Sequence, residues 1–305
     1  MPPSSPQSCA TTPASSELRS PRPREAQAMD EETAPLETPD GIVLLTRHWP
    51  AANPWAAMLI VHGISEHSGR WSHVGAFFAE RGIDTHSFDL RGHGRSGGKK
   101  MYVDEFSEYA DDVAFVAETN VIPLGLPWVL YGHSMGGLIA TGYLLSERPR
   151  PDAAILSAPS LDADIPAHLV LAAKVLGRLT PGLRVKSSIV GEHLSKDPSV
   201  GEAYLADPLV DLRTSTRLGR LAMEEQSPMR ERCAQIDVPT LVIHGADDVL
   251  VPPRASAPLA ASPAVTRKLY PGLRHELHNE PERETVLQDV FAFIEGTLRQ
   301  PAAEA

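Results

Sequence analysis

The amino-acid sequence predicts an α/β fold in which a mostly parallel central sheet is flanked by helices. Short apolar runs of strand length recur along the chain, and stretches with helical spacing lie between them. Buried parallel strands are apolar along their whole length because helices cover both faces of the sheet. The alternation is interrupted once, at about residues 161–235, where we predict a helical insertion.

The strands and helices are predicted in alternating order, which is typical of parallel sheets. The strands are expected at Ile42–Trp49, Ala57–Val61, Ile83–Phe88, Trp128–Tyr131, Ala153–Leu156, Thr240–Ile243 and Arg267–Tyr270. The helices are expected at Val74–Arg81, Glu105–Thr119, Met135–Ser146 and Glu282–Leu298.

The first part of the chain has a different composition. Residues 1–34 are rich in Pro and Ser and lack periodic apolar positions, so we predict a disordered tail before a domain of residues 35–305. Ordered structure is expected to begin near Gly41. Met29 is a candidate alternative start of the native chain, because it lies just before the acidic stretch that precedes the first strand.

The insertion at about residues 161–235 allows two interpretations. It is either an additional packing layer or a cap that covers a ligand crevice, since insertions at the carboxyl edge of a parallel sheet lie above that crevice. In the segment Ile165–Leu179 only Lys174 and Arg178 are charged, and its apolar positions have helical spacing. We therefore expect an apolar cap helix that contacts an acyl chain or, transiently, a membrane surface.

Composition excludes several classes of function. The net charge of −11 argues against nucleic-acid binding, because an acidic surface repels phosphate backbones. The two cysteines provide neither a disulfide framework nor a zinc motif, and we expect no cofactor and no metal. Without a signal peptide or a long apolar segment, the chain is predicted to be cytoplasmic, with peripheral membrane contact as an addition. The oligomeric state is left open.

The strongest chemical signal is Gly132-His133-Ser134-Met135-Gly136, a G-x-S-x-G motif. It follows the apolar run WVLY and opens the helical stretch MGGLIATGYLL. In this strand–turn–helix context the motif forms a sharp turn that lifts the serine above the sheet, and the flanking positions must be small. We predict an α/β-hydrolase fold with Ser134 as the nucleophile.

A serine hydroxyl needs a base and an acid partner, which follow it in this fold in the order acid, then histidine. The run TLVIHGADD offers Asp248, with Asp247 as the alternative. The run RKLYPGLRHELHNE offers His275, which is nearer the strand, and His278, which is expected to line or brace the site.

The oxyanion of an acyl-transfer intermediate needs backbone N–H donors. We expect one from Met135, directly after the nucleophile, and one from Ile64 in the loop His62–His67, where Gly63 lets the backbone approach the substrate. The glycine-rich segment FDLRGHGRSGG also carries Arg91 and Arg95. A phosphate site there is the alternative to a structural loop, which we favour because no phosphate-binding glycine motif is present.

From about Gly41 to the C-terminus, the chain resembles the monoacylglycerol lipase family. The match lies in HGISEHSGR, FDLRGHGRSGG, GHSMGG, HGADD and RHELHNE, which occur in the family's order. The resemblance implies a helical cap at about 161–235. It also implies the triad Ser134, Asp248 and His275, the oxyanion donors Ile64 and Met135, and Glu66, His67 and Arg70 as supports of the oxyanion loop.

These features predict a serine hydrolase that cleaves a carboxylic ester, with monoacylglycerol or a similar single-chain lipid as substrate. A lysophospholipase or general carboxylesterase is the alternative within the same chemistry. An acyltransferase or a non-catalytic binding protein on this scaffold is a more distant alternative. A dehalogenase or epoxide hydrolase normally has Asp where this chain has Ser134.

Overall fold

The computed structural model describes residues 1, 31–163, 167–187 and 189–299. Within them, eight strands form one sheet in the order β1-β2-β4-β3-β5-β6-β9-β10. The strands β1 and β2 run antiparallel to their neighbours, and the remaining pairs are parallel. The predicted, mostly parallel sheet is confirmed. Its strands are β1 (Glu32–Glu37), β2 (Val43–Trp49), β3 (Ala56–Val61), β4 (Ile83–Phe88), β5 (Trp128–His133), β6 (Ala153–Ser157), β9 (Thr240–Gly245) and β10 (Val265–Tyr270).

Strand β1 begins earlier than the sequence predicted. A strand is already present at Glu32–Glu37, before Gly41, so the predicted tail of residues 1–34 overlaps it. The strand is mostly exposed and is held by backbone pairing with β2 rather than by buried side chains, which explains why the apolar pattern missed it. The rest of the predicted tail, including Met29, lies outside the described residues except for Met1.

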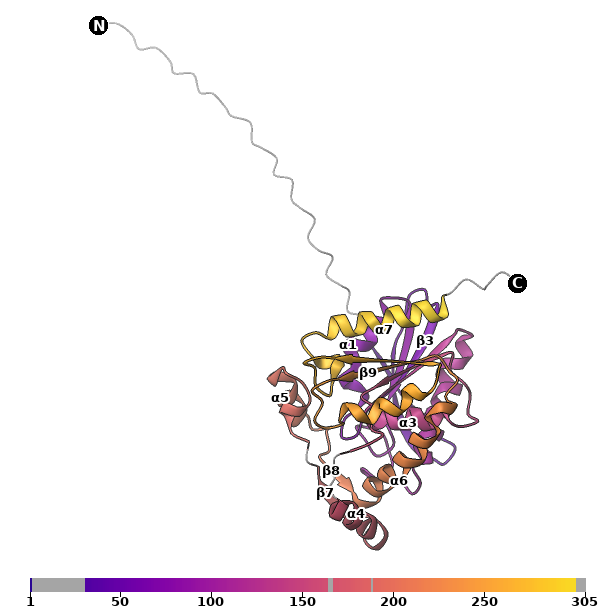
Figure 1. Ribbon diagram of the computed structural model, residues 1–305. Helices are drawn as coiled ribbons and strands as arrows, with labels where there is room; N and C mark the ends of the chain where they lie inside the picture. The colour runs from indigo at the N-terminus through magenta and orange to yellow at the C-terminus, as the bar shows by residue number, and fades with distance from the viewer. Residues whose placement is uncertain (2–30, 164–166, 188, 300–305) are drawn as a thin grey trace.

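Helices cover both faces of the sheet (Figure 1). Helices α1 (Ser72–Ala79) and α7 (Arg283–Leu298) pack on one face, while α2 (Ser107–Val116) and α3 (Met135–Leu144) pack on the other. The strands explain this arrangement because successive side chains point to opposite faces. In β3, Met58 and Ile60 join the first core, whereas Leu59 and Val61 join the second.

The insertion between β6 and β9 forms the cap. It comprises α4 (Ala167–Leu179), β7 (Arg184–Lys186), α5 (Pro198–Ala206), β8 (Arg213–Ser215) and α6 (Thr216–Arg232). Figure 1 shows α4 and the β7–β8 pair at the end of the molecule far from α7. The residues before α4, Ile165 among them, lie outside the described part.

The cap contains a two-stranded antiparallel sheet, β7–β8, which corrects the prediction of a purely helical insertion. Each strand has only three residues, RVK and RTS, and both are largely polar. Such short polar strands carry no alternating apolar pattern that could reveal them. None of the helices among the described residues is long and apolar enough to cross a membrane.

Candidate active site

Ser134 lies on a strained turn between β5 and α3. Its backbone has φ +53° and ψ −116°, a region that L-residues other than glycine rarely occupy. The flanking glycines allow the close approach of strand and helix. A Cβ atom on Gly136 would lie 2.1 Å from the carbonyl oxygen of Val61, and one on Gly132 would lie 2.4 Å from that of Gly136. The motif therefore forms the strand–turn–helix geometry that exposes a serine at the sheet edge.

Asp248 and His275 follow two neighbouring parallel strands, β9 and β10, whose carboxyl ends meet at the same edge. The Nδ1 atom of His275 lies 2.7 Å from the Oδ2 atom of Asp248. The other carboxylate oxygen accepts hydrogen bonds from the backbone N–H groups of Leu250 and Val251, both at 2.9 Å. Asp247 is exposed, whereas Asp248 is buried, so the structure brings Asp248 and not Asp247 to the histidine.

The buried pair favours charge separation. Burial alone would raise the pKa of the Asp248 carboxyl, but the charge of His275 and hydrogen bonds from His244, His275 and the backbone hold that pKa below its usual range. Burial alone would lower the pKa of His275, but the adjacent Asp248 and Glu276 raise it above its usual value. Asp248 is thus a stable anion that can orient and support a protonated imidazole.

Ser134 and His275 line one small cavity, covered by the cap. Space for the centre of a water molecule amounts to only about 20 Å³, which is room for one or two waters. The cap contributes Ile189, Leu194 and Tyr204 to the lining. The site is therefore narrow in this structure. The full lining is Gly63, Ile64, Glu66, His133, Ser134, Ile189, Leu194, Tyr204, Leu250, His275 and Glu276.

The loop after β3 lies directly beside the nucleophile. A Cβ atom on Gly63 would approach the Cβ of Ser134 to 3.1 Å, so only glycine fits comfortably there. The next residue, Ile64, lines the cavity, and Met135 is the first residue of α3. The first N–H groups of a helix have no partner within the helix. The geometry thus places the backbone of both predicted oxyanion donors near Ser134.

Glu66 holds this loop from inside. One of its carboxylate oxygens accepts a hydrogen bond from the N–H of Gly63 at 2.5 Å, and the other accepts from the Trp71 indole at 3.1 Å. Arg70 lies between two carboxylates, donating to Glu66 at 3.3 Å and to both oxygens of Glu276 at 2.6 and 2.7 Å. Sequence reasoning found Glu66 and Arg70 by resemblance but missed Glu276.

Burial and the neighbouring charges shift the pKa values of the two carboxyl groups in this cluster, Glu66 and Glu276. Burial is the main cause that raises the pKa of Glu66, and the nearby Glu276 adds to it. Burial also opposes ionisation of Glu276, but the Arg70 guanidinium outweighs it and lowers the pKa of that carboxyl. The guanidinium lies over the Tyr204 ring, with 4.8 Å between its central carbon and the ring centroid. The oxyanion loop and the cap therefore share one polar cluster.

His67 and His278 have different surroundings. The Nε2 atom of His67 lies 2.9 Å from a carboxylate oxygen of Asp207, at the end of α5, which joins the oxyanion loop to the cap. His278 stacks on Trp71 with 3.9 Å between ring centroids and lies 5.0 Å from the His133 ring. It is not among the described residues that line the cavity, so it packs behind the site.

The glycine-rich loop after β4 is held by ion pairs. Arg91 is buried and paired with Asp40, Glu108 and Asp112, so its charge is already engaged, whereas Arg95 is exposed. The loop also contains Asp89, which accepts hydrogen bonds from the backbone of Ser68 and Arg95. These contacts favour the structural interpretation.

Sequence reasoning missed the residues that the cap and the loop after β10 add to the cavity. Tyr204, Leu194 and Ile189 lie in the part of the chain where no motif could be matched. Glu276 directly follows His275, but only the fold shows that it meets Arg70. A largely buried arginine such as Arg70 needs a carboxylate partner, so its expected place in the oxyanion loop indicates that a carboxylate lies nearby in the fold. It does not indicate which residue supplies that carboxylate.

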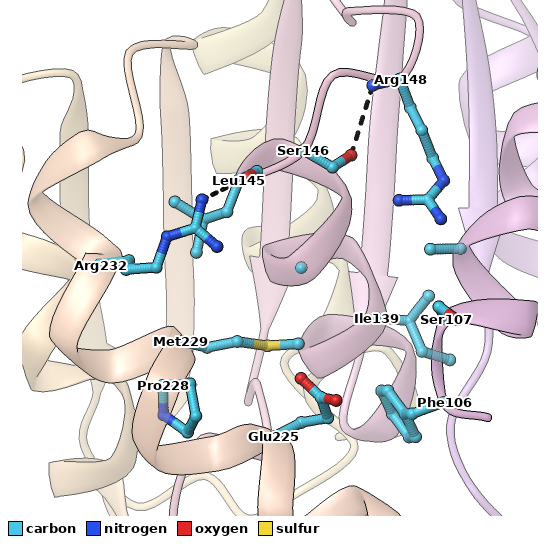
Figure 2. Close-up of a pocket in the computed structure, with 12 residues that line it drawn as sticks. Phe106, Ser107, Ile139, Leu145, Ser146, Arg148, Glu225, Pro228, Met229 and Arg232 are labelled. Carbon is cyan, nitrogen blue, oxygen red and sulfur yellow. Dashed lines mark hydrogen bonds between the residues drawn. The ribbon is translucent and has the colours of Figure 1, made fainter.

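A wider pocket of about 170 Å³ lies elsewhere, between α2, α3 and α6 (Figure 2). Phe106, Ile139 and Met229 line it, and the carboxyl group of Glu225 points into it. No histidine lines it, so it lacks a base for serine chemistry. The smaller cavity at Ser134 is therefore the candidate active site despite its size.

Comparison with known proteins gives a consistent result. Residues 52–282 match the family described as serine aminopeptidase, S33. The chain is 37% identical to a monoacylglycerol lipase of Mycolicibacterium smegmatis over 83% of this chain and 93% of that protein. It is 34% identical to the phospholipase YtpA of Bacillus subtilis over 81% and 98%.

Among solved structures, the monoacylglycerol lipase of Paleococcus ferrophilus superposes with a TM-score of 0.74. The two proteins share 27% identity over 84% of this chain and 99% of that chain. The chain belongs to the monoacylglycerol lipase family, a group of serine hydrolases within the α/β-hydrolase superfamily.

Proposed function

We propose that the protein hydrolyses the ester bond of monoacylglycerols through a Ser134–His275–Asp248 triad. The single observation that carries the proposal is the buried hydrogen bond between Asp248 and His275, in which His275 lines the same cavity as the strained Ser134. A nucleophile, a base and an oriented acid are the parts that acyl transfer by serine requires.

In the proposed reaction, the Nε2 atom of His275 takes the proton of Ser134 while the serine oxygen attacks the ester carbonyl carbon. The N–H groups of Ile64 and Met135 stabilise the resulting oxyanion. Collapse of this intermediate breaks the bond to the glycerol oxygen, which takes the proton from His275. A water then attacks the acyl-enzyme with His275 as base, and the fatty acid is released.

The residues that line the cavity support a substrate with a polyol head and an acyl chain. The lining includes the polar side chains of Glu66, Glu276 and Tyr204. It also includes the apolar residues Ile64, Ile189, Leu194 and Leu250. Glycerol hydroxyls can donate to carboxylates and accept from the tyrosine.

The carboxylates among the lining residues favour glycerol over a phosphate head group. Two carboxylates beside the cavity repel a phosphodiester, and Arg70 is already engaged by both of them. The alternative substrate is a lysophospholipid, and the Bacillus subtilis relative is named a phospholipase. Its turnover on this chain is expected to be much slower than that of monoacylglycerol.

We infer that the cap must move before a long acyl chain can enter, because the cavity at Ser134 has room for no more than one or two waters. The outer surface of α4 carries apolar side chains in solvent, with Leu171 63% and Leu179 75% exposed. Lys174 and Arg178 lie on the same helix. Such a helix can rest on a lipid surface with its apolar side chains in the interface.

The chemistry is tested by labelling the purified chain with a fluorophosphonate and by measuring turnover of a panel of esters. We expect stoichiometric labelling and rapid turnover of monoacylglycerol. Ser134→Ala should abolish both, whereas Ser146→Ala, at the other end of the same helix region, should retain them. Labelling that survives Ser134→Ala would refute the nucleophile. Turnover of lysophospholipid that exceeds turnover of monoacylglycerol would refute the substrate.

The membrane contact is tested with Leu179→Ser, matched by Leu269→Ser on β10, which is also an exposed leucine, at 41%. We expect Leu179→Ser to reduce binding to phospholipid vesicles and turnover of vesicle-borne monoacylglycerol by severalfold. Turnover of a soluble acetyl ester should stay unchanged, and the Leu269 variant should behave as wild type. Equal effects of the two substitutions would contradict a docking role for α4.

A further inference from the structure

Three side chains form a cluster on β2 and β4 that the proposed hydrolysis does not use. His48 on β2 is directly opposite His86 on β4, and Asp84 precedes His86 by two residues, on the same face of the sheet. The Nε2 atoms of both histidines approach one oxygen of Asp84, at 2.8 Å from His48 and 2.7 Å from His86. None of the three lines the cavity at Ser134.

The three donor atoms lie within 4.8 Å of one another. Two imidazoles and one carboxylate are a donor set that suits zinc and similar transition metals, whereas Mg²⁺ and Ca²⁺ prefer oxygen ligands alone. The cluster is not closed on all sides. The Asp84 and His86 side chains are 8% and 7% exposed, but that of His48 is 29% exposed, which gives an ion access from solvent.

Part of an outer shell is also present. The second oxygen of Asp84 accepts a hydrogen bond from the N–H of Ala51 at 3.1 Å. The Nδ1 atom of His48 lies 3.6 Å from a carboxylate oxygen of Glu32, which is opposite it on β1. Metal-bound histidines commonly direct their outer nitrogen at a carboxylate in this way. The outer nitrogen of His86 is buried and has no partner among the described residues.

We propose that His48, Asp84 and His86 form a binding site for one zinc-type divalent cation. The ion binds both Nε2 atoms and one oxygen of Asp84, and water completes the coordination. On binding, the ion takes the place of the hydrogen on each Nε2, and each neutral imidazole carries its proton on Nδ1. The site then links β2, which runs antiparallel to both of its neighbours, to β4.

Binding requires a defined rearrangement. The two rings are stacked with 4.2 Å between centroids and 5° between planes, and both Nε2 atoms approach the same oxygen of Asp84, at 2.8 and 2.7 Å. Zinc lies about 2.0–2.2 Å from nitrogen and oxygen ligands, and in a tetrahedral site such ligands are more than about 3 Å apart. A structure with the ion bound is therefore expected to show both Nε2 atoms further from the Asp84 oxygen than they are here.

The sequence could not indicate this site. Metal motifs are recognised by short spacing between ligands, and His48 is distant in sequence from the Asp84-Thr85-His86 pair. Only the pairing of β2 with β4 brings the three together.

The test is calorimetric titration of the untagged full chain, freed of metal by a chelator, with ZnCl₂ and with MgCl₂. We expect one Zn²⁺ per chain, no Mg²⁺ binding, and a melting temperature that rises with Zn²⁺ concentration. A Co²⁺-loaded sample should show the visible absorption of a site with nitrogen ligands. Absence of Zn²⁺ binding to the wild type would overturn the proposal and leave the cluster a hydrogen-bonded network.

The chain has 12 histidines, including His48 and His86. Variants separate binding at this site from chance binding to the other histidines. Loss of an outer-shell partner typically weakens metal binding about 10–100-fold, so loss of a ligand in His48→Gln should cost at least about 100-fold. Asp84→Asn should do the same, and Glu32→Gln should weaken binding about tenfold. His168→Gln removes an exposed cap histidine and should change nothing. If Asp84→Asn does not fold, the half-exposed His48 decides the result, and unchanged affinity in His48→Gln refutes the site.

Discussion

At the residue scale, the adjacent carboxylates Asp247 and Asp248 have opposite surroundings. Asp248 is buried against His275, whereas Asp247 is exposed. We predict that Asp248→Asn lowers kcat for a soluble ester by about 10⁴-fold, because an amide neither fixes the imidazole tautomer nor stabilises its charge. Asp247→Asn, the matched control, should lower it less than about twofold. A larger loss in the Asp247 variant would mean that the acid is misassigned.

The raised pKa of His275 gives a second prediction at this scale. Burial opposes protonation, but Asp248 and Glu276 outweigh it, so the imidazole stays protonated to a higher pH than usual. A protonated imidazole cannot act as base. The acidic limb of kcat/KM should therefore have its midpoint above about 6.5, the ordinary histidine value. We would measure kcat/KM for a soluble ester between pH 5 and 9 while monitoring folding by circular dichroism. A midpoint near pH 5 would contradict the arrangement.

Much of the candidate site could be predicted from the sequence because its residues lie in short motifs beside strands. Ser134 directly follows β5, and Asp248 and His275 lie in the loops after β9 and β10, so the parallel strands bring all three to one edge of the sheet. The roles of these residues remain predictions. Glu276 and Tyr204 could not be predicted, because their part in the site depends on contacts with Arg70 across the fold.

At the element scale, the position of α5 depends on a contact between two glycines. A Cβ atom on Gly201 would lie 2.6 Å from the backbone of Gly191, so Gly201→Ala must displace the helix that carries Tyr204. We predict that kcat/KM falls about tenfold or more, since a shift of about 1 Å near a reacting group can cost about 10²-fold.

The control is Gly219→Ala in α6, where a Cβ atom meets nothing within 4 Å. It should leave kcat/KM unchanged and stabilise the helix by about 1 kcal/mol or less. Both variants are assayed for turnover and for melting temperature. Normal turnover in Gly201→Ala would show that the position of α5 does not limit the reaction.

Elements that bury apolar side chains were the ones that the sequence revealed. Strands β3 and β5 are buried along their whole length and were predicted within two residues at each end. Strands β1 and β7 are held by backbone pairing and have largely exposed side chains, and β8 consists of three polar residues, so no apolar pattern marks them. Edge strands and short cap strands are therefore the part of this fold that periodicity cannot give.

At the scale of the whole molecule, the N-terminal hairpin joins the sheet through one buried charge. Arg47 on β2 is 8% exposed, pairs with Glu31, and donates to the Ser68 hydroxyl at 3.2 Å. Glu31 also contacts the Trp49 indole at 3.2 Å. Glu31 thus supplies the carboxylate that pairs directly with this guanidinium, on which the charge of Asp89 also acts.

This arrangement predicts different results from two truncations. A chain that starts at Met29 keeps Glu31 and β1, and its melting temperature should match the full chain within about 1 °C, because residues 1–28 have too few apolar groups to contribute a core. Deleting residues 1–37 removes β1 and leaves Arg47 without its carboxylate. An unpaired buried charge costs about 3–5 kcal/mol, or roughly 6–20 °C in a domain of this size. Thermal unfolding of both variants, with ester turnover as the second readout, decides the matter. A large drop in melting temperature on removing residues 1–28 alone would place a stabilising contact in the tail. An unchanged melting temperature on removing residues 1–37 would show that β1 and its ion pair are dispensable for stability.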